Sequence, residues 1–195
     1  YINDRRKEVW QAYSHVMRSI LENFSEGVSN VRMDSNFLLW QGEDGKALTW
    51  MDAVIDGNPV TARKGYAVEI NSLWYNAVMF YRELAKLQCE DGEIAKWDEF
   101  AANFPTNFKA TFWSKEIGYL ADCVDGSNKD FSVRCNMIFA ASLEYSPISP
   151  KIRQLIVEKV RQELLTPKGL RTLSTTNKVY HATNFGYQSQ TGRAS

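Results

Sequence analysis

The stretch VEINSLWYNAVMFYRELAKL, residues 68–87, carries a strong helical pattern in this 195-residue chain. Its apolar side chains recur at steps of three and four residues, which is the spacing of one face of an amphipathic helix. A chain of this length corresponds to about one domain and can bury a substantial hydrophobic core. The pattern therefore predicts a helix that buries one broad face, formed by Leu73, Trp74, Ala77, Phe80, Tyr81, Leu84 and Leu87.

Further helical patterns flank this segment on both sides. Residues 9–24 repeat the same spacing until Gly27, which predicts a first helix. Ser149 and Pro150 form a good N-cap and first-turn pair for a late helix. The patterns after residue 87 cover residues 92–103, 105–116 (which Pro105 should start), 134–144 and 150–164. Together they predict an all-α protein of about six helices.

The segments between these helices are long, and they differ in character. Residues 28–66 lack helical periodicity, and a connection of this length is usually either functional or disordered. They are too apolar for disorder, so we expect an ordered loop that can include short strands. Residues 171–195 are rich in Ser, Thr, Asn and Gln, and we expect them to form a mobile loop or tail.

The composition limits the classes of partner. The 23 basic and 23 acidic residues cancel, so the chain lacks the electrostatic footprint of a protein that binds nucleic acid or an anionic membrane. No apolar run is long enough to span a bilayer. Aromatic residues reach 13%, including six Trp and nine Tyr. This surplus fits either a heavily aromatic core or a pocket that stacks sugar rings.

Cysteine and histidine usage argues against disulfides and metals. Cys89, Cys123 and Cys135 are odd in number and form no Cys-x-x-Cys pair, so we expect reduced thiols. His15 and His181 are the only histidines, and neither belongs to a cluster with metal-ligand spacing. We expect no metal and no cofactor. With no signal peptide recognised at the start, we expect the protein in the cytoplasm.

Asp52 is the most unusual carboxylate of the chain. Trp50 and Met51 precede it, and an apolar run follows. A carboxyl among apolar groups is partly desolvated, which favours the protonated form that a general acid needs. The alternative is that Asp52 caps a turn or pairs with Arg63. Glu69 is explained by the helix dipole alone, because acidic residues are favoured in a first turn. Asn71 lies on a polar-aromatic stripe that is more often core than ligand site.

Taken together, these segments resemble the glucosidase domain of glycogen debranching enzymes, the amylo-α-1,6-glucosidases. The resemblance covers about residues 37–174 in ordered blocks at family-like distances. The first blocks are LTWMDA (48–53), then Thr61 with Arg63, then VEINSLWYNAV (68–78). The later blocks are FKATFWSKEIGYLADCVDG (108–126), VRCNMIFAASLEYSPIS (133–149) and LLTPKGLRTLS (164–174).

The resemblance implies a fold and a reaction. The family fold is an (α/α)6 toroid with its active site in the loops at one end. Its reaction is inverting hydrolysis of a single α-1,6-linked glucose on a branched α-glucan, with Asp52 at the position of the general acid. The family's general base is a Glu downstream of the last matched block, so we expect it beyond Ser195. Residues 1–195 would then be an internal piece of the catalytic domain, inactive alone.

The resemblance also suggests binding roles, although this sequence departs from the family at Ala62, Cys135 and Met137, where the family commonly has Pro, Pro and Gln. Ala62 loosens the turn before Arg63, and Met137 lacks the amide of the family Gln, which bears on fine specificity. Glu69 matches a family Glu that is not the base, and Asp122 lies in a block suited to binding or support. The candidate substrate-binding residues are Trp50, Arg63, Glu69, Asn71, Trp74, Trp113, Lys115, Arg134 and Asn136. For each tryptophan, core packing is the equal alternative to stacking on glucose.

Two other functions remain open from the sequence. The chain could be a non-catalytic helical module that binds glucan without turnover. It could also resemble a trehalase- or phosphorylase-like toroid enzyme, although the Thr-Trp-Met-Asp, Val-Glu-Ile-Asn and Trp-Tyr-Asn-Ala set favours the debranching group. Half a toroid would expose the apolar faces of its inner helices, so we expect the isolated chain to self-associate.

Overall fold

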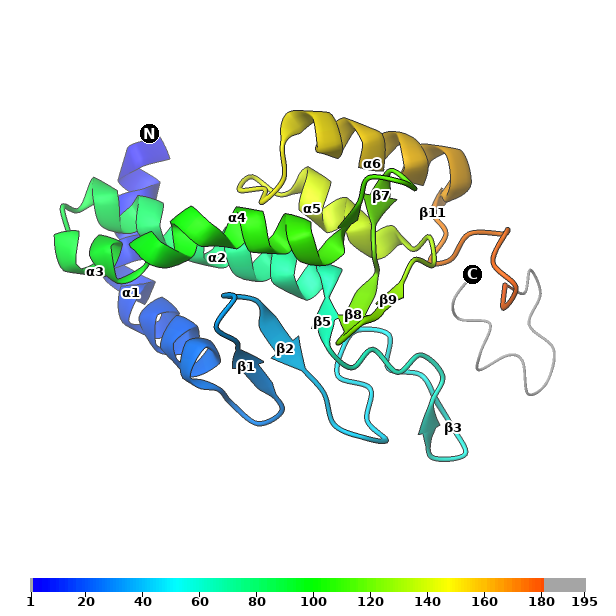
Figure 1. The fold of residues 1–195 in the computed structure, drawn as a ribbon. Helices are drawn as coiled ribbons and strands as arrows, with labels where there is room; N and C mark the ends of the chain where they lie inside the picture. The colour runs from blue at the N-terminus through cyan, green and yellow to red at the C-terminus, as the bar shows by residue number, and fades with distance from the viewer. Residues whose placement is uncertain (1, 181–195) are drawn as a thin grey trace.

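The computed structural model describes residues 2–180, and helix α2 (Val68–Leu87) lies at the centre of it, as the sequence predicted. Helix α2 contacts α1, α3, α4 and α5, and α5 in turn packs against α6 (Figure 1). The core is therefore built around one helix that has neighbours on several sides. The bounds of the other helices are α1 (Ile2–Glu26), α3 (Asp91–Lys96), α4 (Asp98–Phe112), α5 (Ile138–Ser142), which follows a 3-10 turn (Cys135–Met137), and α6 (Pro150–Glu163).

The fold is mixed, so the predicted all-α class is wrong. Eleven short strands pair in five small antiparallel sheets among the described residues, and the helices do not form a closed toroid. Segments of two or three residues are too short to show the alternation that identifies a strand in sequence. The strands are β1 (Val31–Met33), β2 (Leu39–Gln41), β3 (Val54–Ile55), β4 (Asn58–Pro59), β5 (Tyr66–Ala67), β6 (Trp113–Ser114), β7 (Tyr119–Leu120), β8 (Cys123–Asp125), β9 (Asn128–Asp130), β10 (Leu165–Thr166) and β11 (Gly169–Leu170).

Helix α4 runs through Pro105, where the sequence analysis expected a new helix to begin. Proline removes one helical hydrogen bond and usually breaks a helix. Here four buried phenylalanines at four-residue spacing form an aromatic column with ring centroids 4.7–5.9 Å apart. The burial of this column offsets the lost hydrogen bond. Its members are Phe100, Phe104, Phe108 and Phe112.

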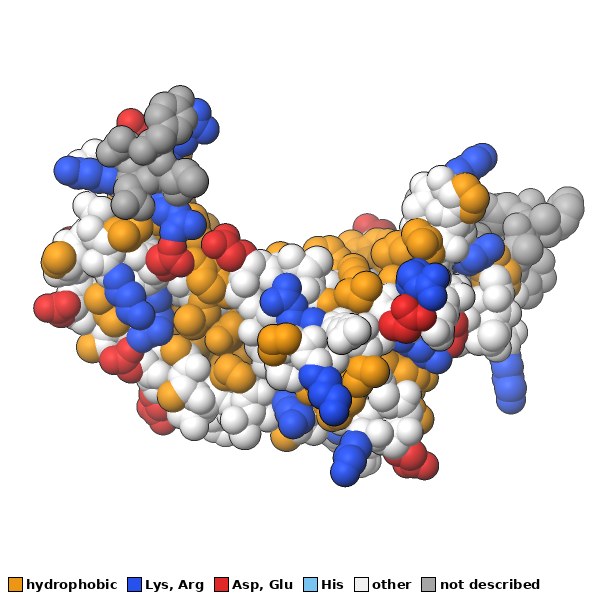
Figure 2. Space-filling model, turned by 90° about the horizontal axis from the view of Figure 1, so that it is seen from above, with side chains coloured by type: hydrophobic (Ala, Val, Ile, Leu, Met, Phe, Trp, Pro, Cys, Tyr) orange, Lys and Arg blue, Asp and Glu red, His pale blue; other side chains and the backbone are white. Residues whose placement is uncertain are grey.

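Helix α1 is longer than predicted, and only part of its apolar face is covered. Trp10 and Leu21 are buried, whereas Tyr13, Val16 and Ile20 are exposed. An apolar groove of about 370 Å³ lies between α1, the β1–β2 hairpin and α2. Figure 2 shows hydrophobic side chains exposed between charged ones on one face of the molecule. None of the described helices has the length and apolar character needed to cross a membrane.

The segment after α6 is partly ordered. The β10–β11 hairpin follows the helix, and Leu173 then forms an isolated bridge with Arg134. Leu173 and Ser174 are both buried. The expected mobile tail over residues 171–195 falls mainly on residues 181–195, which lie outside the described residues, as does His181.

Gly65 permits a close backbone approach beside the β5–β8 pair. Its φ is +110°, and a Cβ atom there would lie 2.2 Å from the carbonyl oxygen of Val124 in β8. We expect Gly65→Ala to lower the free energy of unfolding by about 2–3 kcal/mol, because strain and a backbone clash add. Gly57→Ala is the matched control: its φ is +79°, and a Cβ there would meet nothing within 4 Å among the described residues.

Urea unfolding of the two glycine variants measures this difference. Gly57→Ala should cost about 1 kcal/mol, the effect of the left-handed backbone alone. Equal losses in the two variants would show that the approach of β5 to β8 imposes no steric limit.

Candidate active site

A buried charged cluster lies where the β5–β8 pair meets the start of α2. The guanidinium of Arg63 lies between two carboxylates, with Nη1 and Nη2 donating to the two oxygens of Glu69, the second at 2.6 Å. Its Nε donates to Asp122 Oδ2 at 2.8 Å, and Nη2 also donates to the Asp122 carbonyl at 3.0 Å. All three side chains are at most 2% exposed. This buried cluster therefore holds together the loop before β5, the first turn of α2 and the residue before β8.

Local pairing explains how residues 59 positions apart come together. Strand β5 pairs with β8 so that Ala67 lies opposite Cys123. Asp122 precedes β8, and its carbonyl accepts the backbone N–H of Val68, the first residue of α2. The sheet therefore brings Asp122 to the helix N-terminus, where Glu69 lies in the first turn. Arg63 enters from the loop before β5 and fills the space between the two carboxylates.

Asn136 links this cluster to the loop that carries Asp52. Its Nδ2 donates to Asp122 Oδ1 at 2.7 Å, and its Oδ1 accepts the indole N–H of Trp50 at 2.9 Å. The same Nδ2 lies 3.5 Å from the sulfur of Met51. Asn136 is fully buried, whereas Trp50 is 51% exposed. A continuous series of hydrogen bonds therefore runs from the buried ion pair to an aromatic ring at the surface.

Arg134 adds a second buried cation beside Asp122. Its Nε lies 3.8 Å from Asp122 Oδ2, which is an ion-pair distance without a hydrogen bond. Neither its Nε nor its Nη1 finds an acceptor among the described residues, although both atoms are buried. Buried donors without acceptors are costly. Arg134 therefore retains donor capacity next to a cluster whose other members are satisfied.

The charges within the cluster balance, since Arg63 and Arg134 face Glu69 and Asp122. Burial lowers the pKa of Arg63, but the hydrogen bonds and charges of Glu69 and Asp122 raise it by more, so the guanidinium stays charged. Burial raises the pKa of Asp122, and Arg63 opposes this only in part. The Asp122 carboxylate thus depends on Arg63 for its charged form.

Asp52 lies at the surface, two residues after the anchored Trp50. Its side chain is exposed, so the predicted partial desolvation is wrong. The alternative pairing with Arg63 is also absent, because that guanidinium is occupied by Glu69 and Asp122. Asp52 is accessible to a ligand, and its loop is tied to the buried cluster through Trp50 and Met51.

The structure brings together Trp50, Arg63, Glu69, Arg134 and Asn136 of the residues proposed from sequence. Asp122 joins them at the centre of the cluster, and the sequence had assigned its block only to binding or support. Neither Asn136 nor Glu69 presents a free polar group to solvent. Their contacts favour support of the site over contact with a ligand.

The remaining candidates have other surroundings. The amide of Asn71 bonds to both backbone groups of Leu39 and clamps β2 to α2. Trp74 packs in the core against Trp97 and Phe100, with centroids 5.8 and 5.7 Å away. Trp113 is half-buried in β6, and Lys115 is exposed in the β6–β7 turn. The sequence pattern could not separate these positions from those that join the cluster.

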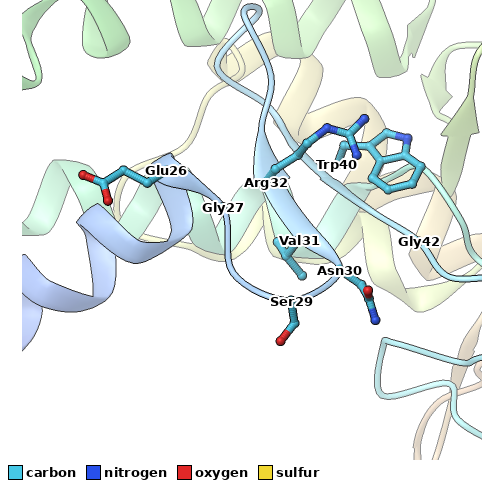
Figure 3. Close-up of a pocket in the computed structure, with 8 residues that line it drawn as sticks. All are labelled: Glu26, Gly27, Ser29, Asn30, Val31, Arg32, Trp40 and Gly42. Carbon is cyan, nitrogen blue, oxygen red and sulfur yellow. The ribbon is translucent and has the colours of Figure 1, made fainter.

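A separate polar pocket of about 370 Å³ lies between the end of α1 and the β1–β2 hairpin (Figure 3). Glu26, Ser29 and Asn30 contribute to its lining. The guanidinium of Arg32 lies 4.0 Å from the ring centroid of Trp40, so one aromatic face there is already covered. Asn30 also donates to Glu43. None of these residues belongs to the charged cluster.

Cysteine chemistry offers a check on the burial of the cluster. Cys123, next to Asp122, is buried, and burial raises the pKa of its thiol from 9.0 to about 12. Burial also raises the pKa of Cys135. Cys89 is exposed. At pH 8 only about one Cys123 in ten thousand would be a thiolate, the reactive form.

We therefore expect iodoacetamide at pH 8 to label Cys89 in the native protein, and to label Cys123 only after denaturation, as mass spectrometry would show. Because protonated Cys123 favours the folded state, its contribution to stability is complete below pH 9.0 and is lost as the pH rises toward about 12. Rapid native labelling of Cys123 would contradict the burial of this part of the cluster.

Comparison with known proteins identifies the chain as a glycoside hydrolase-like domain. It belongs to the amylo-alpha-1,6-glucosidase family, whose model matches residues 1–194. This confirms the resemblance seen in the sequence blocks. No curated protein matched the sequence.

A solved structure also resembles the chain, namely the GH78 family rhamnosidase of Bacillus sp. GL1. The two share 17% identity with a TM-score of 0.55, over 87% of this chain and 16% of the rhamnosidase chain. A likeness at this identity shows a shared fold. The present chain thus spans about a sixth of the length of that protein.

Proposed function

We propose that this chain forms part of an inverting glycoside hydrolase that removes α-1,6-linked glucose from a branched α-glucan, with Asp52 as the general acid. One observation carries the proposal: an exposed carboxyl lies two residues after an exposed tryptophan whose indole is anchored on a buried network. An aromatic face packs against the apolar face of a sugar ring, and a nearby carboxyl can protonate the glycosidic oxygen.

The general base must come from another carboxylate. Inversion requires two carboxyl groups about 6.5–9.5 Å apart, with a water activated between them. Glu69 and Asp122 are poor candidates, because both are buried and engaged by Arg63. We therefore propose a base downstream of Ser195, as the family pattern implies.

A non-catalytic glucan-binding module is the second candidate. The exposed ring of Trp50 would suit saccharide binding without turnover. Such a module would retain saccharide affinity after Asp52 is replaced, since a general acid contributes to the transition state and little to ground-state binding.

The test is glucose release from a branched maltooligosaccharide with a single α-1,6-linked glucose. The longer enzyme that we propose should release glucose as the β-anomer, which proton NMR detects before mutarotation. The 195-residue chain alone should release none. Release of the α-anomer would exclude inversion, and turnover by the short chain would place the base within it.

The remaining proposals concern location and partners. We propose a cytoplasmic protein whose partner is branched α-glucan, without nucleic acid or membrane. We also propose that isolated copies of the chain associate with one another through the exposed apolar side chains of α1, namely Tyr13, Val16 and Ile20. A monomer at all concentrations in analytical ultracentrifugation would contradict this association.

A further inference from the structure

Among residues 2–180, Asn136 is the side chain that joins the Asp52 loop to the buried ion pair through hydrogen bonds to both. Its amide is fully buried, and both ends are engaged by protein groups: Oδ1 by the indole of Trp50, and Nδ2 by Asp122. The amide oxygen could accept a second hydrogen bond, but Asn136 is fully buried, so this acceptor does not face solvent or a bound ligand. The contacts of Asn136 are those of a side chain that fixes its neighbours.

The far end of this connection is rigid. Asp122 Oδ1 accepts from Asn136 at 2.7 Å, while Oδ2 accepts from Arg63 at 2.8 Å. Arg63 in turn bonds to Glu69 in the first turn of α2. Charge-assisted hydrogen bonds of this kind are short and geometrically specific. Asn136 is therefore held by groups anchored on the central helix and on β8.

The near end of the connection is exposed and short of regular structure. Residues 51–53 belong to neither a helix nor a strand, and Trp50 is 51% exposed. Among the described residues, the indole bond to Asn136, at 2.9 Å, and the contact of the Met51 sulfur with the same amide tie residues 50–52 to the body of the protein. Without them, burial alone would do little to fix the place of Asp52.

We propose that Asn136 is a positioning residue, which sets the orientation of the acid-bearing loop by holding the Trp50 indole against Asp122. The proposal rests on the function proposed above for Asp52. Arg63 and Glu69 act indirectly: Glu69 holds Arg63, and Arg63 holds the Asp122 carboxylate that orients Asn136. Misplacement of a catalytic group by about 1 Å can cost a hundredfold in rate, so loss of this anchor should slow the chemical step.

Two variants remove the hydrogen bond between the Trp50 indole and Asn136, which we call the anchor, one from each partner. Trp50→Phe removes the indole N–H but keeps an aromatic ring, and because Trp50 is exposed, the change should cost little stability. Asn136→Ala removes the acceptor. Trp40→Phe makes the same ring change on β2, outside the cluster, and serves as the control. The substrates are an α-1,6-linked oligosaccharide and α-glucosyl fluoride, whose fluoride leaves with little need for an acid.

In the longer enzyme we expect kcat for the oligosaccharide to fall about tenfold or more in each anchor variant, with KM changed far less. The rate on glucosyl fluoride should stay within about twofold, because the acid contributes little there. The double variant should be no slower than the slower single variant, since both remove one interaction. Trp40→Phe should keep both rates.

A spectroscopic measurement on the 195-residue chain tests the anchor itself. Trp50→Phe assigns the Trp50 indole signal in a proton–nitrogen NMR spectrum. In Asn136→Ala this signal should shift and its proton should exchange with water faster, while the other tryptophan signals, which report the fold, should stay in place.

The outcomes separate the two proposals. Equal slowing on both substrates would indicate a general structural role and overturn the inference, as would unchanged kcat in both anchor variants. If Asp52→Asn abolishes oligosaccharide cleavage while Trp50→Phe does not slow it, the inference fails and the proposed function stands. If Asp52→Asn keeps full activity, the proposed function is wrong, and the inference that rests on it is wrong as well.

Discussion

Asp52→Asn should lower kcat/KM for the branched oligosaccharide by about a thousandfold, the range expected for loss of a general acid. Asparagine has nearly the same shape but carries no ionisable proton to donate. Because Asp52 is exposed, the change should leave folding intact. The measurement is the rate of glucose release by the longer enzyme over a range of substrate concentrations.

The chain offers a matched control four residues further on. Asp56 is also exposed and has a φ of 49°, a conformation that asparagine tolerates well. Asp56→Asn removes the same charge from the same stretch and should keep the wild-type rate. On α-glucosyl fluoride, Asp52→Asn should lose far less activity than on the oligosaccharide. Wild-type activity of Asp52→Asn on the oligosaccharide would remove Asp52 from the mechanism.

The helices of this protein were predictable because their signals are long. Helix α2 matches the predicted bounds, and α6 begins at the predicted Ser149 cap, whose hydroxyl accepts from the backbone of Ile152. Periodicity identified helices but not burial, since Leu73 and Leu87 of the predicted buried face are exposed. Burial depends on which neighbours arrive, and the sequence pattern of one helix does not contain them.

The strands and the cluster could not be derived in the same way. Strands β3, β4 and β5 have two residues each, and their pairing depends on partners elsewhere in the chain. Arg63 and Asp122 are 59 residues apart and meet only because β5 pairs with β8. The family blocks indicated that these residues matter. They could not show that Asn136 faces the protein and Asp52 faces solvent.

Arg63→Ala is the substitution with the largest expected cost in stability. It leaves Glu69 and Asp122 buried without their shared cation, and removing one partner of a buried pair costs about 3–5 kcal/mol. Lys64→Ala is the control, because Lys64 pairs with Asp44 at the surface, where solvent screening leaves an ion pair little effect on stability. Urea unfolding of the 195-residue chain measures both.

The stability of Arg63→Ala should depend on pH, because the buried Asp122 carboxylate has lost its cation. Burial already raises the pKa of Asp122, and loss of the Arg63 charge raises it more, so the folded state holds its proton to a higher pH than the unfolded state. Protonation therefore stabilises the variant at acid pH, and this contribution is lost as the pH rises through the raised pKa. The deficit against wild type should be smaller at pH 5 than at pH 8.

Adding Glu69→Gln and Asp122→Asn to Arg63→Ala should recover part of the loss, since neutral amides need no cation. A variant as stable as Lys64→Ala at every pH would show that the ion pair is not what holds this site together.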